Sequence, residues 1–267
     1  ENSTRFDLYR VDLDGKNQQR LSFGEYTHNV SLSPKGTYFI STYSNASSPE
    51  KIALINNKGK LILELGDGKG ADFDNVEIAK TEIIRIPSED GKYQLPIRII
   101  WPLNYDPTKK YPVIESIYAG PHDAFTKKSW GPWLMPMHEV AVHGFIVVKI
   151  DGRGTAHRGK EFHHFCYKNL KDAGLPDRMA WMKAAAKKFP QMDLSRVGIF
   201  GGSAGGQNAL GALLFHGDFY KAAAADCGCH DNRMDKIWWN EQWMDWPVGP
   251  HYADNSNVIH AKNLKGA

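Results

Sequence analysis

The sequence contains no hydrophobic run that approaches the roughly 18 residues of a membrane-spanning helix, so no membrane span is expected in this chain. It also lacks an excess of either charge, because 33 basic and 30 acidic residues are mixed along its length and leave a net charge of +3. No basic patch is present. We therefore expect no nucleic acid and no anionic membrane as a partner.

Cysteine is scarce, with Cys166, Cys227 and Cys229 the only three. Three cysteines cannot all pair with one another, and a chain of 267 residues can bury a core without disulfides, so the count does not identify a redox compartment. The run Cys227-Gly228-Cys229-His230 is similar to half of a metal site, but no second cluster of ligands lies nearby in the sequence. We expect no metal and no cofactor.

The first residues, ENSTRFDLYR, contain neither an initiator methionine nor the apolar segment of a signal peptide. We therefore expect this chain to be part of a longer protein. Its hydrophobic content of 42% is typical of a folded protein. At roughly 100 to 200 residues per domain, one large domain or two smaller ones are expected.

The N-terminal quarter has the pattern of short antiparallel strands. Within residues 5–65, segments such as YFISTY (38–43) and KLILEL (60–65) alternate apolar and polar residues, and turn pairs such as Asp14-Gly15 separate them. About five strands are predicted, which is too few to close a barrel but enough for one propeller blade and part of another. We expect residues 1–75 to be the C-terminal part of a β-propeller domain; a small independent β-domain is the alternative.

The pattern changes after the linker-like segment GDGKGADFDN. Three apolar runs, YPVIESIYAGP (111–121), GFIVVKIDGRG (144–154) and RVGIFGGS (196–203), are typical of strands that are covered on both faces. Between the last two, residues 176–190 repeat apolar side chains at helical spacing. Strands that alternate with helices predict an α/β fold with a mostly parallel sheet over residues 76–267, with ligands bound at the carboxyl ends of its strands.

Ser203 stands at one of those strand ends, within Gly201-Gly202-Ser203-Ala204-Gly205. A Gly-x-Ser-x-Gly run permits the sharp turn between strand and helix that presents a nucleophilic serine, and the amide of Ala204 would point to a developing oxyanion. A dinucleotide-binding loop requires glycine where Ser203 stands, and a phosphate-binding loop requires a lysine that is absent here. The remaining alternative is that the glycines only allow the helix to pack closely.

Four motifs resemble a known family in order and spacing. They are YAGP (118–121), DGRG (151–154), GGSAGG (201–206) and NVIHAKNLKG (257–266). The chain is similar in these motifs to the prolyl oligopeptidase family of serine peptidases, and most of all to its dipeptidyl peptidase IV branch. The resemblance implies an α/β-hydrolase domain capped by a β-propeller and the cleavage of short peptides, many after proline or alanine.

The resemblance also implies roles for individual residues. Ser203 matches the nucleophile, Ala204 matches the residue whose amide serves the oxyanion hole, and Tyr118 matches the tyrosine that supplies the second donor. Trp238 and Trp239 match the region that forms the wall of the pocket for the residue before the scissile bond; packing in the core is the alternative for them. The pair His122-Asp123 departs from this branch and is similar to other branches of the family.

A serine nucleophile needs a histidine base and a carboxylate that orients it, in the chain order Ser, acid, His. In the resembled family both follow a further strand that begins after NLKG, so we expect them beyond Ala267 and expect this chain alone to be inactive. An internal alternative would combine Asp226 or Asp231 with a later histidine. The candidates are His230, His251 and His260.

The sequence thus predicts a serine peptidase that acts on peptides through an acyl-enzyme at Ser203. A carboxylic-ester hydrolase of the same fold and a non-catalytic, propeller-bearing binding protein are the alternatives. Following the resemblance, we expect an exported protein, periplasmic or extracellular, and a homo-oligomer formed through the hydrolase domain.

Overall fold

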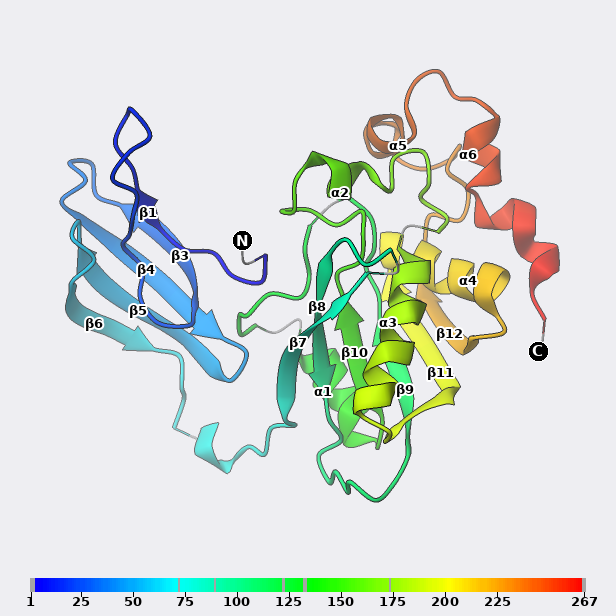
Figure 1. The fold of residues 1–267 in the computed structure, drawn as a ribbon, viewed down its shortest axis with the longest axis horizontal. Coiled ribbons are helices and arrows are strands. Elements are labelled where there is room, and N and C mark those ends of the chain that lie inside the picture. The colour runs from blue at the N-terminus through cyan, green and yellow to red at the C-terminus, as the bar shows by residue number, and fades with distance from the viewer. Residues whose placement is uncertain are drawn as a thin grey trace. The chain divides into compact units, whose positions relative to one another are not determined.

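The computed structural model describes residues 3–71, 73–88, 90–121, 123–131, 134–172 and 174–265. His122, which departs from the resembled branch, lies outside the described residues. The chain divides into two compact units, Glu1–Thr81 with Lys127–Pro136 and Glu82–Thr126 with Met137–Ala267 (Figure 1). The domain boundary expected between residues 75 and 76 remains a prediction.

The first unit contains the six N-terminal strands (Figure 1). β1 (Tyr9–Arg10) and β2 (Gln19–Arg20) form an antiparallel pair. The next four strands pair antiparallel in chain order: β3 (Thr27–Leu32), β4 (Tyr38–Asn45), β5 (Ser48–Asn56) and β6 (Leu61–Asp67). A short 3-10 helix, η1 (Phe73–Asn75), follows them. These are the predicted propeller strands, and the four-stranded meander has the form of one blade.

The alternating sequence pattern gives this blade one buried face. Phe39 and Tyr43 on β4, and Ala53 and Ile55 on β5, form a small core with Leu21. The neighbouring positions along the same strands point away from that core, because successive side chains of a strand lie on opposite faces. The period of two thus determines which side chains the blade buries.

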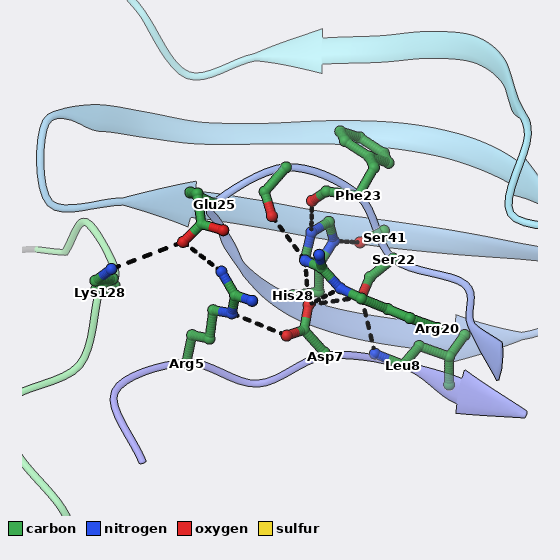
Figure 2. Close-up of polar contacts among 11 residues, drawn as sticks. Arg5, Asp7, Leu8, Arg20, Ser22, Phe23, Glu25, His28, Ser41 and Lys128 are labelled. Carbon is green, nitrogen blue, oxygen red and sulfur yellow. Dashed lines mark hydrogen bonds and ion pairs between the residues drawn. The ribbon is translucent and has the colours of Figure 1, made fainter. Parts of the chain in front are cut away.

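Charged side chains connect the N-terminal segment to the blade (Figure 2). The carboxylate of Asp7 accepts hydrogen bonds from Arg5 at 2.9 Å, Arg20 at 2.7 Å and Ser22 at 2.7 Å. Burial raises the pKa of Asp7, but these hydrogen bonds and the two arginine charges outweigh it, so the net pKa is lowered. Arg5 also pairs with Glu25 at 2.5 Å.

The second unit is built on a six-stranded sheet with the order β12-β11-β9-β10-β8-β7. Its strands are β7 (Thr81–Pro87), β8 (Gln94–Ile100), β9 (Tyr111–Ser116), β10 (Ile146–Ile150), β11 (Met192–Gly202) and β12 (Tyr220–Asp226). The four strands β10, β9, β11 and β12 are parallel, whereas β8 runs antiparallel to β10. The predicted α/β-hydrolase fold with a mostly parallel sheet is confirmed.

Helices lie between several strands of this sheet along the chain, and others follow its last strand, β12 (Figure 1). They are α1 (Met135–Val142), α2 (Lys160–His164), α3 (Leu175–Lys188), α4 (Ala204–His216), α5 (Ile237–Met244) and α6 (Pro250–Asp254), followed by the 3-10 helix η3 (Asn257–Asn263). α3 covers the segment whose helical spacing predicted it. Among the described residues, no helix combines the length and the apolar character that crossing a bilayer requires.

The sheet core contains a buried ion pair among its aliphatic side chains. Glu115 on β9 accepts a hydrogen bond from Arg178 of α3 at 2.5 Å and another from the hydroxyl of Tyr220 at 2.8 Å. The side chains of Glu115 and Arg178 are fully buried. Burying a charge is costly, and the direct contact between these two opposite charges offsets part of that cost. The contacts tie α3 to the middle of the sheet.

Candidate active site

Ser203 occupies the tight turn between β11 and α4. Its backbone has φ 57° and ψ −124°, a conformation that L-residues seldom adopt. The Ser203 amide donates a hydrogen bond to the carbonyl oxygen of Asp226 at 2.9 Å, and the Ser203 carbonyl accepts one from Gln207 at 3.1 Å. These contacts hold the turn, and the Ser203 residue is exposed. The backbone thus has the strained geometry that a nucleophilic serine at a strand-to-helix turn requires.

Gly205 allows α4 to begin directly against the sheet. A Cβ atom at this position would overlap the carbonyl group of Ile117, the residue that follows β9 by one position. The absence of a side chain therefore lets the first turn of α4 approach the end of β9. This close approach brings the turn at Ser203 beside the segment that carries Tyr118.

A hydrogen bond within the core joins the same two segments. The backbone amide of Ala119 donates to Oδ1 of Asn208 on α4 at 3.0 Å, and Asn208 is only 3% exposed. Asn208 thus fixes the chain directly after Tyr118 to the helix directly after Ser203. The two residues that the sequence assigned to the nucleophile and the second oxyanion donor are held at the same edge of the sheet.

A cavity of about 270 Å³ opens at this edge. Its lining residues are Tyr118, Ser203, Ala204, Cys227, Gly228, Cys229, Asp235, Lys236, Trp238 and Trp239. All five residues predicted from the sequence, the nucleophile, the two oxyanion residues and the two tryptophans, therefore border one space. Their chemical roles remain predictions.

The two tryptophans belong to the first turn of α5. Trp238 is 62% exposed, whereas Trp239 is half-buried. Their ring centroids lie 6.1 Å apart with an interplanar angle of 88°, so the rings meet edge to face. Both tryptophans line the cavity. The alternative interpretation, in which they only pack in the core, would not predict this position.

Sequence reasoning did not assign Cys227, Cys229, Asp235 or Lys236 to the cavity. Cys229 is half-buried, and burial raises the pKa of its thiol to about 12, with the charge and hydrogen bonding of Asp235 acting in the same direction. The Cys229 thiol is therefore protonated at neutral pH. Only the positions of these residues in the sequence could have indicated that they line the cavity, because all four fall between the end of β12 and the start of α5.

The loop that follows Tyr118 is fixed by Asp151, the first residue of the DGRG motif. The Asp151 carboxylate accepts hydrogen bonds from the amides of Phe125 at 2.9 Å and Thr126 at 2.7 Å. The Phe125 ring packs on Tyr118 with centroids 4.8 Å apart. Burial raises the pKa of Asp151, while the two backbone hydrogen bonds lower it. Asp151 therefore supports Tyr118 through Phe125.

Arg153, the other charged residue of the same motif, has a structural contact. Its guanidinium pairs with Asp177 at 2.8 Å and with Asp90 at 3.0 Å. The motif thus forms a turn that an ion pair holds in place. Asp177 is fully buried at the start of α3, so the pair anchors the turn to that helix.

The histidines weighed as an internal base have other partners. His230 Nδ1 lies 3.1 Å from Asn257 Nδ2, His251 Nε2 lies 2.6 Å from the Met244 carbonyl oxygen, and His260 Nε2 lies 2.8 Å from that of Asp254. Within the described part of the chain, none of the three hydrogen-bonds the Ser203 hydroxyl. This geometry gives no support to a triad formed inside these residues.

Metal-ligating residues do not gather here. Over the described residues, no group of three or more histidine, cysteine, aspartate or glutamate side chains could hold a metal ion. The sulfur of Cys229 instead lies 3.5 Å from the Asp231 carbonyl oxygen, and that of Cys227 lies 3.5 Å from Oδ2 of Asp226. The Cys-Gly-Cys-His run therefore has hydrogen-bonding partners of its own.

Two models of known protein families match parts of this chain. The sequence model of the prolyl oligopeptidase family matches residues 135–267, which include Ser203 and both tryptophans. The model of the dipeptidyl peptidase IV N-terminal region matches residues 1–50. The chain belongs to the prolyl oligopeptidase family. The similarity to the dipeptidyl peptidase IV branch that the four motifs indicated is thereby confirmed.

Individual members of the family match over most of this chain. Dipeptidyl peptidase 8 of Mus musculus is 29% identical over 217 residues, which cover 77% of this chain and 24% of that protein. The protein named probable dipeptidyl-aminopeptidase B of Arthroderma benhamiae is 28% identical over 265 residues, covering 96% of this chain and 29% of its own.

A solved structure extends the match to three dimensions. The crystal structure of Porphyromonas gingivalis dipeptidyl peptidase 4 superposes with a TM-score of 0.88 at 28% sequence identity. The superposition covers 99% of this chain and 38% of that chain. The chain thus spans between about a quarter and two fifths of the length of the relatives that it matches.

Proposed function

We propose that this protein is a serine peptidase that cleaves short peptides through an acyl-enzyme at Ser203. The observation that carries the proposal is the shared cavity, in which the strained Ser203 lies with Tyr118 and Ala204. The peptidases that the chain is similar to lend it further support. Nucleophile and oxyanion donors must face one space for acyl transfer to occur.

The chemistry begins at the serine hydroxyl. Ser203 Oγ attacks the carbonyl carbon of the scissile peptide bond, and a base takes the hydroxyl proton. The negative charge that develops on the carbonyl oxygen is stabilised by the Ala204 amide and the Tyr118 hydroxyl, each of which contributes about 3 kcal/mol in comparable sites. The amine leaves with a proton, and water then hydrolyses the acyl-enzyme.

The proposed reaction also needs a histidine base and a carboxylate that orients it. The three internal histidines are hydrogen-bonded elsewhere, so we propose that the histidine and the acid belong to sequence that follows residue 267, as the resemblance implies. It follows that the 267-residue chain alone would hydrolyse peptides slowly or not at all. The oxyanion donors would still be in position.

Active-site labelling tests the proposal. A fluorophosphonate probe should label the product of the complete gene, and the Ser203→Ala variant should not be labelled. Equal labelling of both proteins, or of neither, would contradict a nucleophilic role for Ser203. A Tyr118→Phe variant should keep the fold but lose roughly 100-fold in the rate of hydrolysis, because one oxyanion donor is removed.

Substrate panels separate the alternatives. Hydrolysis of short peptides supports the peptidase, whereas turnover of carboxylic esters without any peptide cleavage would favour the ester hydrolase. A folded protein that reacts with neither substrate nor probe would favour the non-catalytic binding protein. Export to the periplasm or the exterior, and a homo-oligomer formed through the hydrolase domain, remain parts of the proposal that fractionation and light scattering would test.

A further inference from the structure

A carboxylate borders the cavity beside the candidate nucleophile. Asp235 lines the same space as Ser203, and its side chain is only 18% exposed. The thiol of Cys229 lines the same cavity, and the negative charge of Asp235 adds to burial in raising the pKa of that thiol. An acidic side chain that is held in a small pocket needs a hydrogen-bond donor or a cation as its counterpart.

Lys236 is the cation nearest to this carboxylate in the structure. Its Nζ lies 3.4 Å from Oδ1 of Asp235, but the Lys236 side chain is 60% exposed. A long, mostly exposed side chain in such a pair is weakly held, because the gain in Coulomb energy is screened by water and opposed by the loss of side-chain freedom. Another cation that enters the cavity could therefore displace Lys236 into solvent at little cost.

The aromatic residues of the cavity favour the same kind of ligand. Trp238 and Trp239 contribute their rings, and the π-face of tryptophan attracts ammonium and guanidinium groups more strongly than that of any other side chain. The apolar stem of a lysine or arginine would pack against the same rings. A volume of about 270 Å³ is suited to one side chain rather than to a larger ligand.

We propose that this cavity is a specificity pocket for a substrate side chain that carries a positive charge, with Asp235 as the residue that recognises it. The inference rests on the proposed function, since it assigns a substrate class to the same site. The ammonium or guanidinium N–H groups donate to the Asp235 carboxylate, while the stem packs against the tryptophan rings that line the cavity. A lysine or arginine side chain thus takes the position that the family resemblance gave to proline or alanine.

A binding experiment tests the pocket without any need for catalysis. N-acetyl-lysine methylamide and N-acetyl-norleucine methylamide differ in the terminal charge, and each is titrated into the 267-residue protein while the indole N–H signals are followed by NMR. We expect the lysine compound to bind about tenfold more tightly and to shift the signals of Trp238 and Trp239. Equal affinity of the two compounds would overturn the inference.

Three variants identify the recognising group. Asp235→Asn keeps the shape and removes the charge, so it should abolish the preference, whereas Lys236→Met should strengthen lysine binding by removing the competitor. The matched control is Glu241→Gln on α5, the helix that follows Asp235; Glu241 does not line this cavity, so this variant should keep the tenfold preference. An unchanged preference in Asp235→Asn would contradict the assignment, and circular dichroism would verify that each variant folds.

The outcome is separable from that of the proposed function. One outcome is that the protein prefers the lysine compound but a fluorophosphonate does not label Ser203 in the product of the complete gene. This result would support the proposed pocket and contradict the proposed peptidase activity. The opposite outcome is that labelling depends on Ser203 but the norleucine compound binds as tightly as the lysine compound. This result would support the peptidase and contradict only the proposed specificity for a positive charge.

Discussion

Oδ1 of Asn208 accepts a hydrogen bond from the backbone amide of Ala119 at 3.0 Å. The bond connects the helix that begins after Ser203 to the residue that follows Tyr118. It is buried, so water does not compete for either group. The relative position of the candidate nucleophile and the candidate oxyanion donor therefore depends on a side chain that does not line the cavity.

Asn208→Ala should lower the free energy of unfolding by about 1 to 3 kcal/mol, because it leaves the Ala119 amide buried without a partner. Urea denaturation followed by tryptophan fluorescence would measure the change. Gln191→Ala is the control, since Gln191 donates to the Pro107 carbonyl in an exposed setting. A loss no larger than that of the control would contradict this role for Asn208.

Gly205→Ala should destabilise the protein by about 2 kcal/mol or more, because the new methyl group meets the Ile117 carbonyl and the first turn of α4 must shift. Thermal unfolding would register the loss. Gly70→Ala provides the comparison, as a Cβ there would meet nothing within 4 Å and φ is not positive. Similar melting temperatures for both variants would show that the close approach is dispensable.

Asp151→Ala should lower the free energy of unfolding by about 2 to 4 kcal/mol, since the amides of Phe125 and Thr126 lose their shared acceptor. The loop that packs on Tyr118 would loosen, and hydrogen exchange of these two amides should accelerate. Asp218→Ala, at an exposed position, serves as the control. Unchanged exchange at residues 125 and 126 would refute the anchoring role of Asp151.

Lys149 should make stability depend on pH above neutrality. Burial lowers the pKa of its ammonium group to about 8, and the unfolded chain has the ordinary value of about 10.4. Between these values the unfolded state binds more protons, so the Lys149 contribution to stability increases as pH rises through that range. Below pH 8 both states are protonated, and the cost of burying the charge is fully present.

The Lys149→Met variant isolates this effect. The unfolding free energy of the wild-type protein, measured relative to the variant, should rise by roughly 1 to 3 kcal/mol between pH 7.5 and pH 10. Chemical denaturation at four or five pH values would measure it. A constant difference between the two proteins would mean that the Lys149 ammonium is not penalised by its surroundings.

The sequence predicted the architecture well because both units follow simple periodicities. The alternation in residues 38–43 determines which face of β4 is buried, and the apolar runs predicted the parallel strands around β11. Ser203 and Tyr118 could be found because they stand at strand ends, and carboxyl ends of parallel strands converge. These signals are local in the chain.

Other parts of the site arise from contacts that no local pattern contains. Asp151 reaches a loop 25 and 26 residues before it, and Asn208 reaches back 89 residues to Ala119. Asp235 lines the cavity only because the segment after β12 turns back toward Ser203. Each depends on how separate elements pack, so the residue types alone did not distinguish these side chains from ordinary surface or core residues.

At Ser203, the residue that would best suit the backbone conformation is not the residue that the proposed reaction needs. Glycine would adopt φ 57° without the roughly 1 kcal/mol or more that a residue with a Cβ loses there. Ser203→Gly is therefore expected to raise the melting temperature while it removes the hydroxyl. A search for heat-resistant variants would favour the very substitution that deprives the cavity of its nucleophile, so thermal tolerance and reactivity oppose each other at this single position.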